Sequence, residues 1–292
     1  MSQVELFDTH CHIHEAVRKT TPVYDKWHEK GPIDPEAVLA DAREAGVSRL
    51  LCIGTTPADS ELAIEFAAGH ENMWASIGIH PHEAGEALQN GTCDAFAGLA
   101  ARPKVVAVGE CGLDYFYNHS PKEAQIEVLR FQIELALKHD LPLSFHVREA
   151  FDDFWPIFES YKGIRGVLHS FTDSLENLER ALSHGLYIGV NGIATFAREP
   201  EKRVMYITIP QHSLLLETDA PFLTPTPYRG TICVPKHVRV TAEFLSQLRG
   251  EDLGELAAAT THNALELFGL PTKEVDKHDT RNSSIQITGE SD

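Results

Sequence analysis

The sequence lacks several features that mark common protein classes. It contains no run of about 18 apolar residues, so it offers no candidate transmembrane helix. Its first residues, MSQVELFDTH, have neither the basic nor the apolar region of a secretory signal peptide, and we therefore expect a soluble cytoplasmic protein. The five cysteines are scattered and form no CxxC pair, which argues against a disulfide framework and against a thiolate zinc site.

Positive charge is also scarce. The chain has 25 lysines and arginines against 43 aspartates and glutamates, which gives a net charge of -18. Such a charge repels polyanions at long range, so we expect no general affinity for duplex nucleic acid, and an anionic substrate would need cations at its own site. The motifs of P-loop NTPases, serine α/β hydrolases and HExxH metalloproteases are missing as well.

Eight short β-branched or apolar segments recur along the chain, each followed by a polar or glycine break. They are residues 4–10, 49–55, 73–80, 105–110, 141–147, 166–171, 186–192 and 214–220. Segments of helical periodicity lie between most of them. Alternating strands and helices predict a parallel sheet, and eight strands allow closure into a (β/α)8 TIM barrel, an α/β fold. The alternative is an open doubly wound sheet, although no GxGxxG follows the first strand.

Two further helices are expected after the eighth strand, near residues 236–249 and 251–268, on the outside or bottom of the barrel. No internal repeat or linker marks a second domain. We therefore expect residues 1–270 to form one barrel domain with an extra C-terminal helix, and residues 271–292 to form a polar, flexible tail.

Ionisable side chains close five of the predicted strands. These side chains are His10, His12, Glu110, His146, His169 and Asp219. Because the carboxyl ends of barrel strands meet at one mouth, we expect them to converge there. A single histidine at a strand end is more often a hydrogen-bonded structural residue, but six convergent groups would be costly to desolvate without a cation. The pattern therefore predicts a site for one or two divalent ions.

Four other residues are expected near the same mouth. His80 and His82 follow the third strand, either as hydrogen-bond donors to the ligands or as substrate contacts. Arg148 lies two residues beyond His146 and can offer its guanidinium to a phosphate, the alternative being an ion pair with a carboxylate. Arg229 lies in the loop after the eighth strand, either as a substrate contact or as a solvated loop arginine.

The segment 15–31 follows the first strand and should overhang the mouth. It combines lysines and arginines with Tyr24 and Trp27 in a strongly acidic chain. Cations beside aromatic rings suit a single-stranded nucleic acid, so we expect Lys26 and Trp27 to contact substrate. The alternative is a solvated lid packed by its aromatic residues.

These motifs resemble the TatD-type deoxyribonucleases, which belong to the amidohydrolase-like metal-dependent hydrolases. The resemblance covers about residues 4–270 and depends on FDTHCHIH, GIHPHEA, AVGECGLDYFY, SFHVREA, GVLHSFTDS, GVNGIATF, LLLETDAPFLTPTPYRG and THNALELF. It implies a nuclease that cleaves phosphodiester bonds from DNA 3′ ends and uses two divalent ions, Mg²⁺, Mn²⁺ or Zn²⁺. The expected partner is single-stranded DNA or another phosphodiester, with no membrane and no obligate protein partner.

The resemblance also implies roles for the candidate ligands. His10, His12, Glu110 and Asp219 would bind one ion, and Glu110, His146 and His169 would bind the other. Glu110 and Asp219 would be the catalytic residues, Glu110 as the bridge between the ions and Asp219 as the group that orients the attacking water and takes its proton.

Two positions depart from the family pattern. His14 stands where the family usually has aspartate or asparagine, and Cys233 stands where it usually has asparagine. Both departures concern substrate specificity more than metal binding. The competing functions are a small-molecule hydrolase on the same barrel, acting on a lactone, amide or phosphate ester, and a non-catalytic metal-binding protein.

Overall fold

The structure is a computed structural model, and it describes residues 4–19 and 21–272. Most of the predicted tail, residues 273–292, lies outside the described residues. Within the described ranges, no helix combines the length and apolar character needed to cross a membrane.

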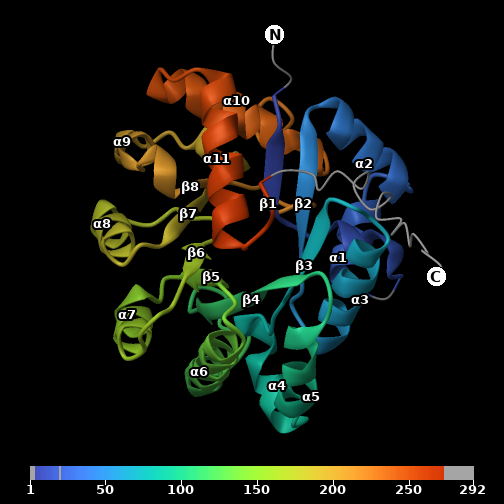
Figure 1. The fold of residues 1–292 in the computed structure, drawn as a ribbon, viewed down its shortest axis with the longest axis vertical. Helices are drawn as coiled ribbons and strands as arrows, with labels where there is room; N and C mark the ends of the chain where they lie inside the picture. Colours follow the sequence, from blue (N-terminus) through green and yellow to red (C-terminus); the bar gives the residue numbers. More distant parts are fainter. Residues whose placement is uncertain (1–3, 20, 273–292) are drawn as a thin grey trace, which may run out of the picture.

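Eight parallel strands form one sheet in sequential order from β1 to β8. They are Leu6–Cys11 (β1), Val47–Ile53 (β2), Met73–Ile77 (β3), Val105–Asp114 (β4), Leu143–Arg148 (β5), Gly166–Leu168 (β6), Tyr187–Val190 (β7) and Leu214–Leu216 (β8). Each predicted segment overlaps one of these strands, with some ends displaced by one to four residues. The sheet curves round with helices on its outside (Figure 1), so the predicted (β/α)8 barrel is confirmed and the doubly wound alternative is excluded.

Several helices begin where the sequence supplies a capping side chain. Asp34, Thr56 and Ser174 each accept a hydrogen bond from a backbone N–H of the helix that follows. The helices are Pro22–His28 (α1), Pro35–Glu44 (α2), Pro57–Ala68 (α3), Ala84–Gln89 (α4), Cys93–Ala97 (α5), Lys122–His139 (α6), Phe151–Glu159 (α7), Leu175–Ser183 (α8), Pro200–Thr208 (α9), Val238–Arg249 (α10) and Leu253–Leu267 (α11). The last two match the helices predicted after the eighth strand.

The first and last strands meet at a seam with little regular pairing. One bridge joins Cys11 to Ala220. The buried carboxylate of Asp8 supplies two more links, since it accepts from the Thr218 backbone N–H at 2.9 Å and from the Thr218 hydroxyl at 2.6 Å. The strand pairing alone therefore leaves the barrel nearly closed, and the side-chain hydrogen bonds of Asp8 help to join its first and last strands.

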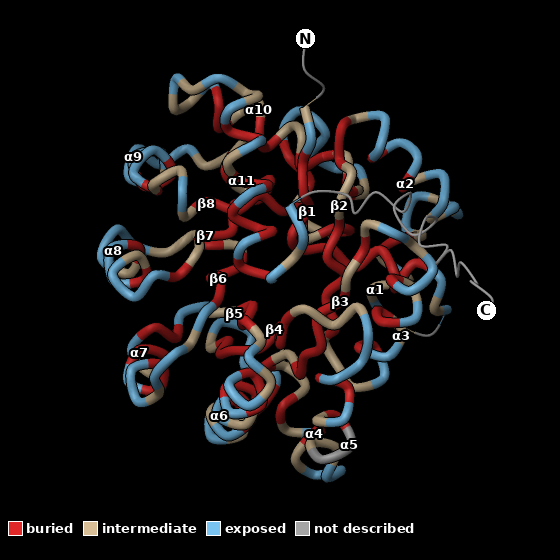
Figure 2. The backbone as a smooth tube through the Cα atoms, viewed as in Figure 1, coloured by how far each residue is buried: buried red, intermediate tan, exposed pale blue. Residues whose placement is uncertain are grey.

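The core has two parts, and the buried residues gather around the strands (Figure 2). The larger part lies between the sheet and its helices. The smaller part fills the barrel interior, where Phe7, Leu51 and Leu215 from the strands pack with Leu265 and Phe268 from the end of α11. The amino-terminal end of the barrel is thus filled by apolar side chains, which leaves the carboxyl ends of the strands for polar chemistry.

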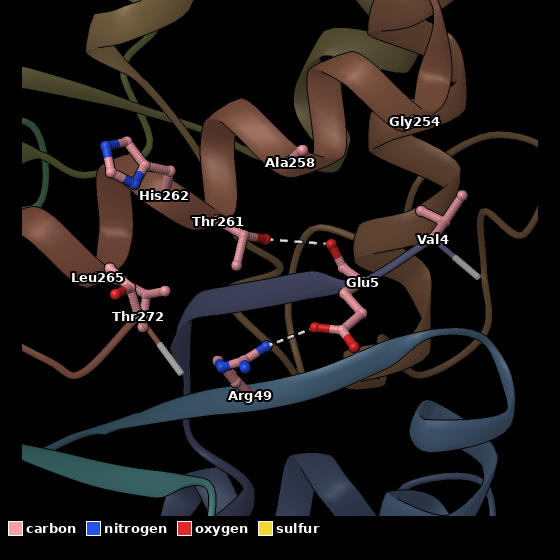
Figure 3. A pocket seen from close by; sticks show the side chains of 9 residues that line it. All are labelled: Val4, Glu5, Arg49, Gly254, Ala258, Thr261, His262, Leu265 and Thr272. Carbon is pink, nitrogen blue, oxygen red and sulfur yellow. Dashed lines mark hydrogen bonds and ion pairs between the residues drawn. The ribbon is translucent and has the colours of Figure 1, made fainter. Parts of the chain in front are cut away.

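A pocket of about 340 Å³ lies at the amino-terminal end, between α11 and the start of β1. Its polar groups already contact one another (Figure 3). Arg49 Nη1 lies 3.0 Å from Glu5 Oε2, and the Thr261 hydroxyl donates to the Glu5 carbonyl at 3.1 Å. The charge of Arg49 is therefore neutralised within the protein.

Candidate metal centre

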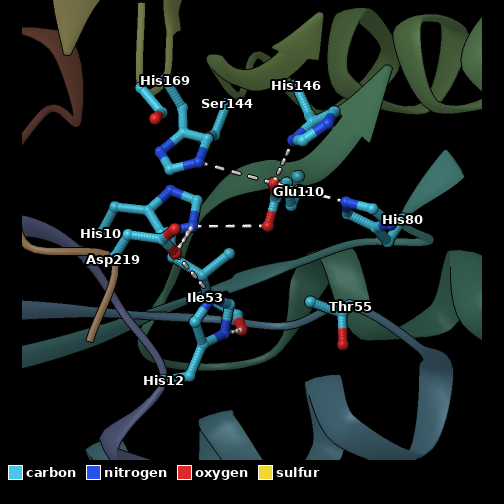
Figure 4. A network of polar contacts seen from close by, with 12 residues as sticks. His10, His12, Ile53, Thr55, His80, Glu110, Ser144, His146, His169 and Asp219 are labelled. Atoms are coloured by element: carbon cyan, nitrogen blue, oxygen red, sulfur yellow. Dashed lines mark hydrogen bonds and ion pairs between the residues drawn. The ribbon is translucent and has the colours of Figure 1, made fainter. Parts of the chain in front are cut away.

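The six side chains predicted as ligands lie together at the carboxyl ends of the strands (Figure 4). They are His10, His12, Glu110, His146, His169 and Asp219. A pocket of about 640 Å³ opens beside them, and all of them except the fully enclosed His10 line it. The convergence that the sequence predicted is therefore present.

Asp219 faces the two histidines of the first strand. Its Oδ1 lies 3.4 Å from His12 Nε2 and 3.6 Å from His10 Nε2. Its side chain is 16% exposed, against 6% for Glu110, so Asp219 is the more accessible of the two carboxylates to a molecule in the pocket.

Glu110 lies at the centre of the cluster. Its Oε2 is 3.4 Å from His10 Nε2, and its Oε1 is 3.6 Å from His169 Nε2. Its Oε1 is also 2.8 Å from His146 Nδ1, a hydrogen-bond distance. One carboxylate therefore faces three histidines that come from three different strands.

These residues fit a divalent cation. His10 is buried, and neither of its ring nitrogens has a hydrogen-bond partner. Leaving a buried polar atom without a partner is costly, whereas a cation placed between nitrogen and oxygen atoms 3.4–3.6 Å apart would coordinate both. The sets His10 with His12 and Glu110, and His10 with His169 and Asp219, each bring three ligand atoms within 4.8 Å of one another.

The electrostatics keep the carboxylates ionised. Burial opposes the charge of Glu110, but the surrounding histidines outweigh it and hold the pKa of Glu110 well below its usual value. Asp219 has its pKa lowered in the same way, with the hydrogen bond from His12 as the largest opposing cause. Burial lowers the pKa of His10, which favours the neutral imidazole that binds metals.

Two buried carboxylates that the sequence analysis missed hold the other two histidines. Asp114 Oδ2 accepts from His146 Nε2 at 2.9 Å, and Glu217 Oε1 lies 2.9 Å from His169 Nδ1. Burial alone would lower the pKa of each histidine, but these carboxylates help raise the pKa of His146 to about 9 and that of His169 to about 10. Such partners orient a ligating imidazole and fix which nitrogen faces the ion. The available signal for Glu217 was a carboxylate inside the apolar run LLLETD.

His80 lies closer to the cluster than the sequence analysis expected. Its Nε2 is 3.6 Å from Glu110 Oε1, and His80, Glu110 and His146 form a third set of ligand atoms within 4.8 Å. Burial lowers the pKa of His80 to about 4, so its ring is neutral. His82 contacts Asp114 instead, with Nε2 3.1 Å from Oδ2.

The two arginines differ in their position. Arg148 lines the pocket, and no carboxylate pairs with it in the described part of the chain, while its contact with substrate stays a prediction. Arg229 is not among the described residues that line the pocket. Its guanidinium lies 4.0 Å from the Phe196 ring and donates to the Thr224 carbonyl at 3.0 Å. A direct role of Arg229 at the cluster has no support from this geometry.

The described residues of the segment 15–31 pack onto the barrel. Trp27 is fully buried, and its indole N–H donates to the His12 carbonyl at 3.0 Å. This burial corrects the expectation that the indole meets a base, because a fully buried ring has no free face, and it fits the alternative of a lid packed by its aromatic residues. Lys26 is 40% exposed and pairs with Glu29 at 2.5 Å, and its contact with substrate stays a prediction.

The two departures from the family pattern are both buried. His14 Nε2 lies 3.0 Å from Asp59 Oδ1, and the other oxygen of Asp59 accepts from the Thr55 N–H at 2.9 Å. Burial opposes the charge of His14, but Asp59 raises the pKa of His14 to about 10. Cys233 is fully buried, and this burial raises the pKa of its thiol. Neither residue lines the pocket among its described residues.

Replacing Asp59 with asparagine should destabilise the fold, because it removes one partner of a buried ion pair. We expect a loss of about 3 kcal/mol or more, which corresponds to roughly 5 °C in melting temperature for a chain of this size. The raised pKa of His14 means that the pair contributes fully below pH 6.5 and loses its contribution as the pH rises toward 10. The difference in melting temperature between variant and wild type should therefore be larger at pH 6 than at pH 10.

The matched control is Glu36→Gln, which removes an exposed partner of His70 and should cost about 1 kcal/mol or less. Equal melting temperatures for Asp59→Asn and wild type at pH 6 would contradict the stabilising role of the pair.

Comparison with known proteins agrees with the geometry. The family model described as TatD-related DNase matches residues 7–269. A protein named 3′-5′ ssDNA/RNA exonuclease TatD from Erwinia tasmaniensis is 40% identical over 248 residues, which cover 81% of this chain and 94% of that protein. The protein of the same name from Escherichia coli K12 is 37% identical, again over 81% and 94% of the two chains. An uncharacterized metal-dependent hydrolase from Bacillus subtilis, YabD, is 34% identical over 90% and 98%.

A solved structure is also similar. The crystal structure of YjjV, a TatD homologue from Escherichia coli K12, superposes with a TM-score of 0.79 at 30% identity, and the match covers 92% of this chain and 99% of that one. A TatD-family hydrolase from Entamoeba histolytica has the same fold, with a TM-score of 0.78 at 23% identity. Sequence, architecture and the cluster of ligand atoms thus agree, and the chain belongs to the TatD-related DNase family.

Proposed function

We propose that this protein is a divalent-metal-dependent 3′-5′ exonuclease that hydrolyses phosphodiester bonds of single-stranded DNA. The observation that carries the proposal is the convergence of four histidines and two carboxylates beside an open pocket of about 640 Å³. A pocket of that size suits a ligand the size of a nucleotide. The names of the relatives from Erwinia and Escherichia, which act on single-stranded DNA and RNA, support this substrate class.

In this proposal the cluster holds two ions. One would be held by His10, His12, Glu110 and Asp219, and the other by Glu110, His146 and His169, with His80 within reach of the second group. When bound, such ions supply an activated water and neutralise charge on the phosphate. Histidine ligands favour zinc or another late transition ion, whereas phosphate chemistry often uses magnesium, so Mg²⁺, Mn²⁺ and Zn²⁺ are the ions to compare.

The chain's own side chains have separate tasks. Asp219 is ionised and faces the pocket, so its Oδ atoms can orient the attacking water and accept its proton. Glu110 is ionised and enclosed, so it holds the ligand set together. Arg148 lines the same pocket, and its positive charge can bind a phosphodiester oxygen in an otherwise acidic chain.

A single-stranded oligonucleotide labelled at its 5′ end tests the proposal directly. After removal of metal with a chelator, we expect activity to fall by at least about 100-fold and to return with Mg²⁺, Mn²⁺ or Zn²⁺. The products should form a ladder that shortens from the 3′ end, with single-stranded DNA cleaved faster than a duplex. An RNA oligonucleotide and a panel of lactones complete the substrates.

The Asp219→Asn variant, purified in the same way, controls for contaminating nucleases. Cleavage from the 5′ end or at internal sites would overturn the exonuclease assignment. Hydrolysis of lactones without cleavage of any oligonucleotide would favour the small-molecule hydrolase.

A further inference from the structure

Two aromatic side chains stand in solvent beside the pocket. Phe116 is 50% exposed and Tyr117 is 52% exposed, and they follow directly after β4 on the way to α6. Large apolar rings are usually covered, so two adjacent exposed rings call for an explanation. Tyr117 lines the same pocket as the proposed metal ligands, which places its ring within reach of a bound substrate.

Arg148, from the end of β5, lies against both rings. Its guanidinium carbon is 4.1 Å from the centre of the Phe116 ring and 4.8 Å from the centre of the Tyr117 ring. The rings themselves meet edge to face with centres 4.8 Å apart. Among the described residues no carboxylate forms an ion pair with this arginine, so its positive charge and the two exposed aromatic rings lie together beside the pocket.

The backbone of the aromatic pair is fixed by Asp114. Its Oδ1 accepts from the Phe116 N–H at 3.0 Å and from the Tyr117 N–H at 2.9 Å. Its Oδ2 accepts from His146 Nε2 at 2.9 Å. The same buried carboxylate therefore orients a proposed metal ligand and sets the position of the rings relative to it. An exposed loop without a role at the site would not need to be hydrogen-bonded to the carboxylate that orients His146.

The rings of two histidines lie beside Tyr117. His119 lies parallel to Tyr117, with an interplanar angle of 5° and ring centres 5.8 Å apart. His82 meets the Tyr117 ring edge-on at 5.6 Å. The Tyr117 ring thus already stacks in parallel with the ring of His119, which is comparable in size to a pyrimidine.

We propose that Tyr117, supported by Phe116 and Arg148, is the surface on which a nucleobase of the substrate stacks, in a nucleotide next to the cleaved bond. The arginine would hold the adjoining phosphodiester. Stacking on a ring tolerates any base, because every base has a π face, so this surface would bind single strands without reading their sequence. A paired base is already stacked in its duplex, so the same surface would favour unpaired 3′ ends. This inference rests on the proposed nuclease function.

The test uses the Tyr117→Ala and Tyr117→Phe variants on single-stranded oligonucleotides that carry one abasic site at the first, second or third nucleotide from the 3′ end. On the intact strand, we expect Tyr117→Ala to raise KM by about 5- to 100-fold, from the usual contribution of one stacked base. Tyr117→Phe keeps the ring and should bind as wild type does. On the one oligonucleotide that lacks the stacked base, wild type and Tyr117→Ala should have equal KM values.

Tyr228→Ala is the matched control, because Tyr228 is also exposed and stacks on a histidine, His237, yet it does not line the pocket among its described residues. Its KM should stay within about twofold of wild type. Equal losses for Tyr117→Ala on all abasic substrates, a fall in its bound metal, or no loss on the intact strand would overturn the stacking role. A wild-type enzyme inactive on every oligonucleotide would overturn the proposed function, and the stacking role with it.

Discussion

Replacing Glu110 with glutamine should remove most of the bound metal and lower kcat/KM by at least about 1,000-fold. The amide has no negative charge and only one oxygen to offer, whereas the carboxylate faces His10, His146 and His169 through both of its oxygens. If both ions depend on Glu110, the dialysed Glu110→Gln variant should retain less of each ion than the wild type does. Elemental analysis of the dialysed variant and metal titration of its activity measure the two effects.

Glu217→Gln is the matched control for this experiment. Glu217 is equally buried but touches one candidate ligand, His169, rather than the ions themselves. Loss of such an orienting partner typically costs about 10- to 100-fold in metal affinity. Two tightly bound ions in purified Glu110→Gln would show that Glu110 is no bridge.

The Asp219→Asn variant should keep its fold and lose about 100-fold or more in kcat. Asparagine has the same shape and tolerates the left-handed backbone at this position, where φ is +58°. It cannot accept the proton of the attacking water, so the loss should appear in kcat even when metal is saturating. Circular dichroism and melting curves check the fold, and steady-state kinetics across a metal titration separate weaker metal binding from slower chemistry.

Near-wild-type turnover of Asp219→Asn at saturating metal would contradict the role of Asp219 as proton acceptor. A variant whose kcat recovers fully as metal is raised would assign Asp219 to metal binding alone.

The fold and the convergence of the six candidate ligands could be predicted from the sequence because both depend on local patterns. Each strand is a short apolar run, and each ligand, such as His146 or His169, closes one of these runs. The barrel topology then brings the carboxyl ends of these runs together at one mouth, so no pattern between distant residues is needed to predict the cluster. Strand β4 was predicted to end at residue 110 but continues to Asp114, because the glycines at 109 and 112 resemble a break.

The remaining features depend on contacts between distant residues. Asp114 holds His146 across 32 positions, and His14 meets Asp59 across 45, distances over which no local pattern acts. Trp27 was expected at the surface because it lies in a polar segment, but α1 turns its indole inward to the His12 carbonyl. Sequence patterns therefore predicted the cluster of candidate ligands, and the structure was needed for the residues that contact and orient them.

The seam between β1 and β8 also determines at which stage of folding one proposed metal site is complete. His10 lies in the first strand, His12 directly after it, and Asp219 after the last strand, so one proposed ion would join segments more than two hundred positions apart. The backbone links the same segments, since the Asp219 N–H donates to the His10 carbonyl at 2.8 Å. During synthesis, the first two ligands emerge long before their carboxylate partner, and they can form no complete cation site until β8 docks. The site of this one proposed ion would thus be completed only at the end of folding, and the ion, once bound, would cross-link the first and last strands as a disulfide links two loops, so that opening the barrel at the seam would require its release.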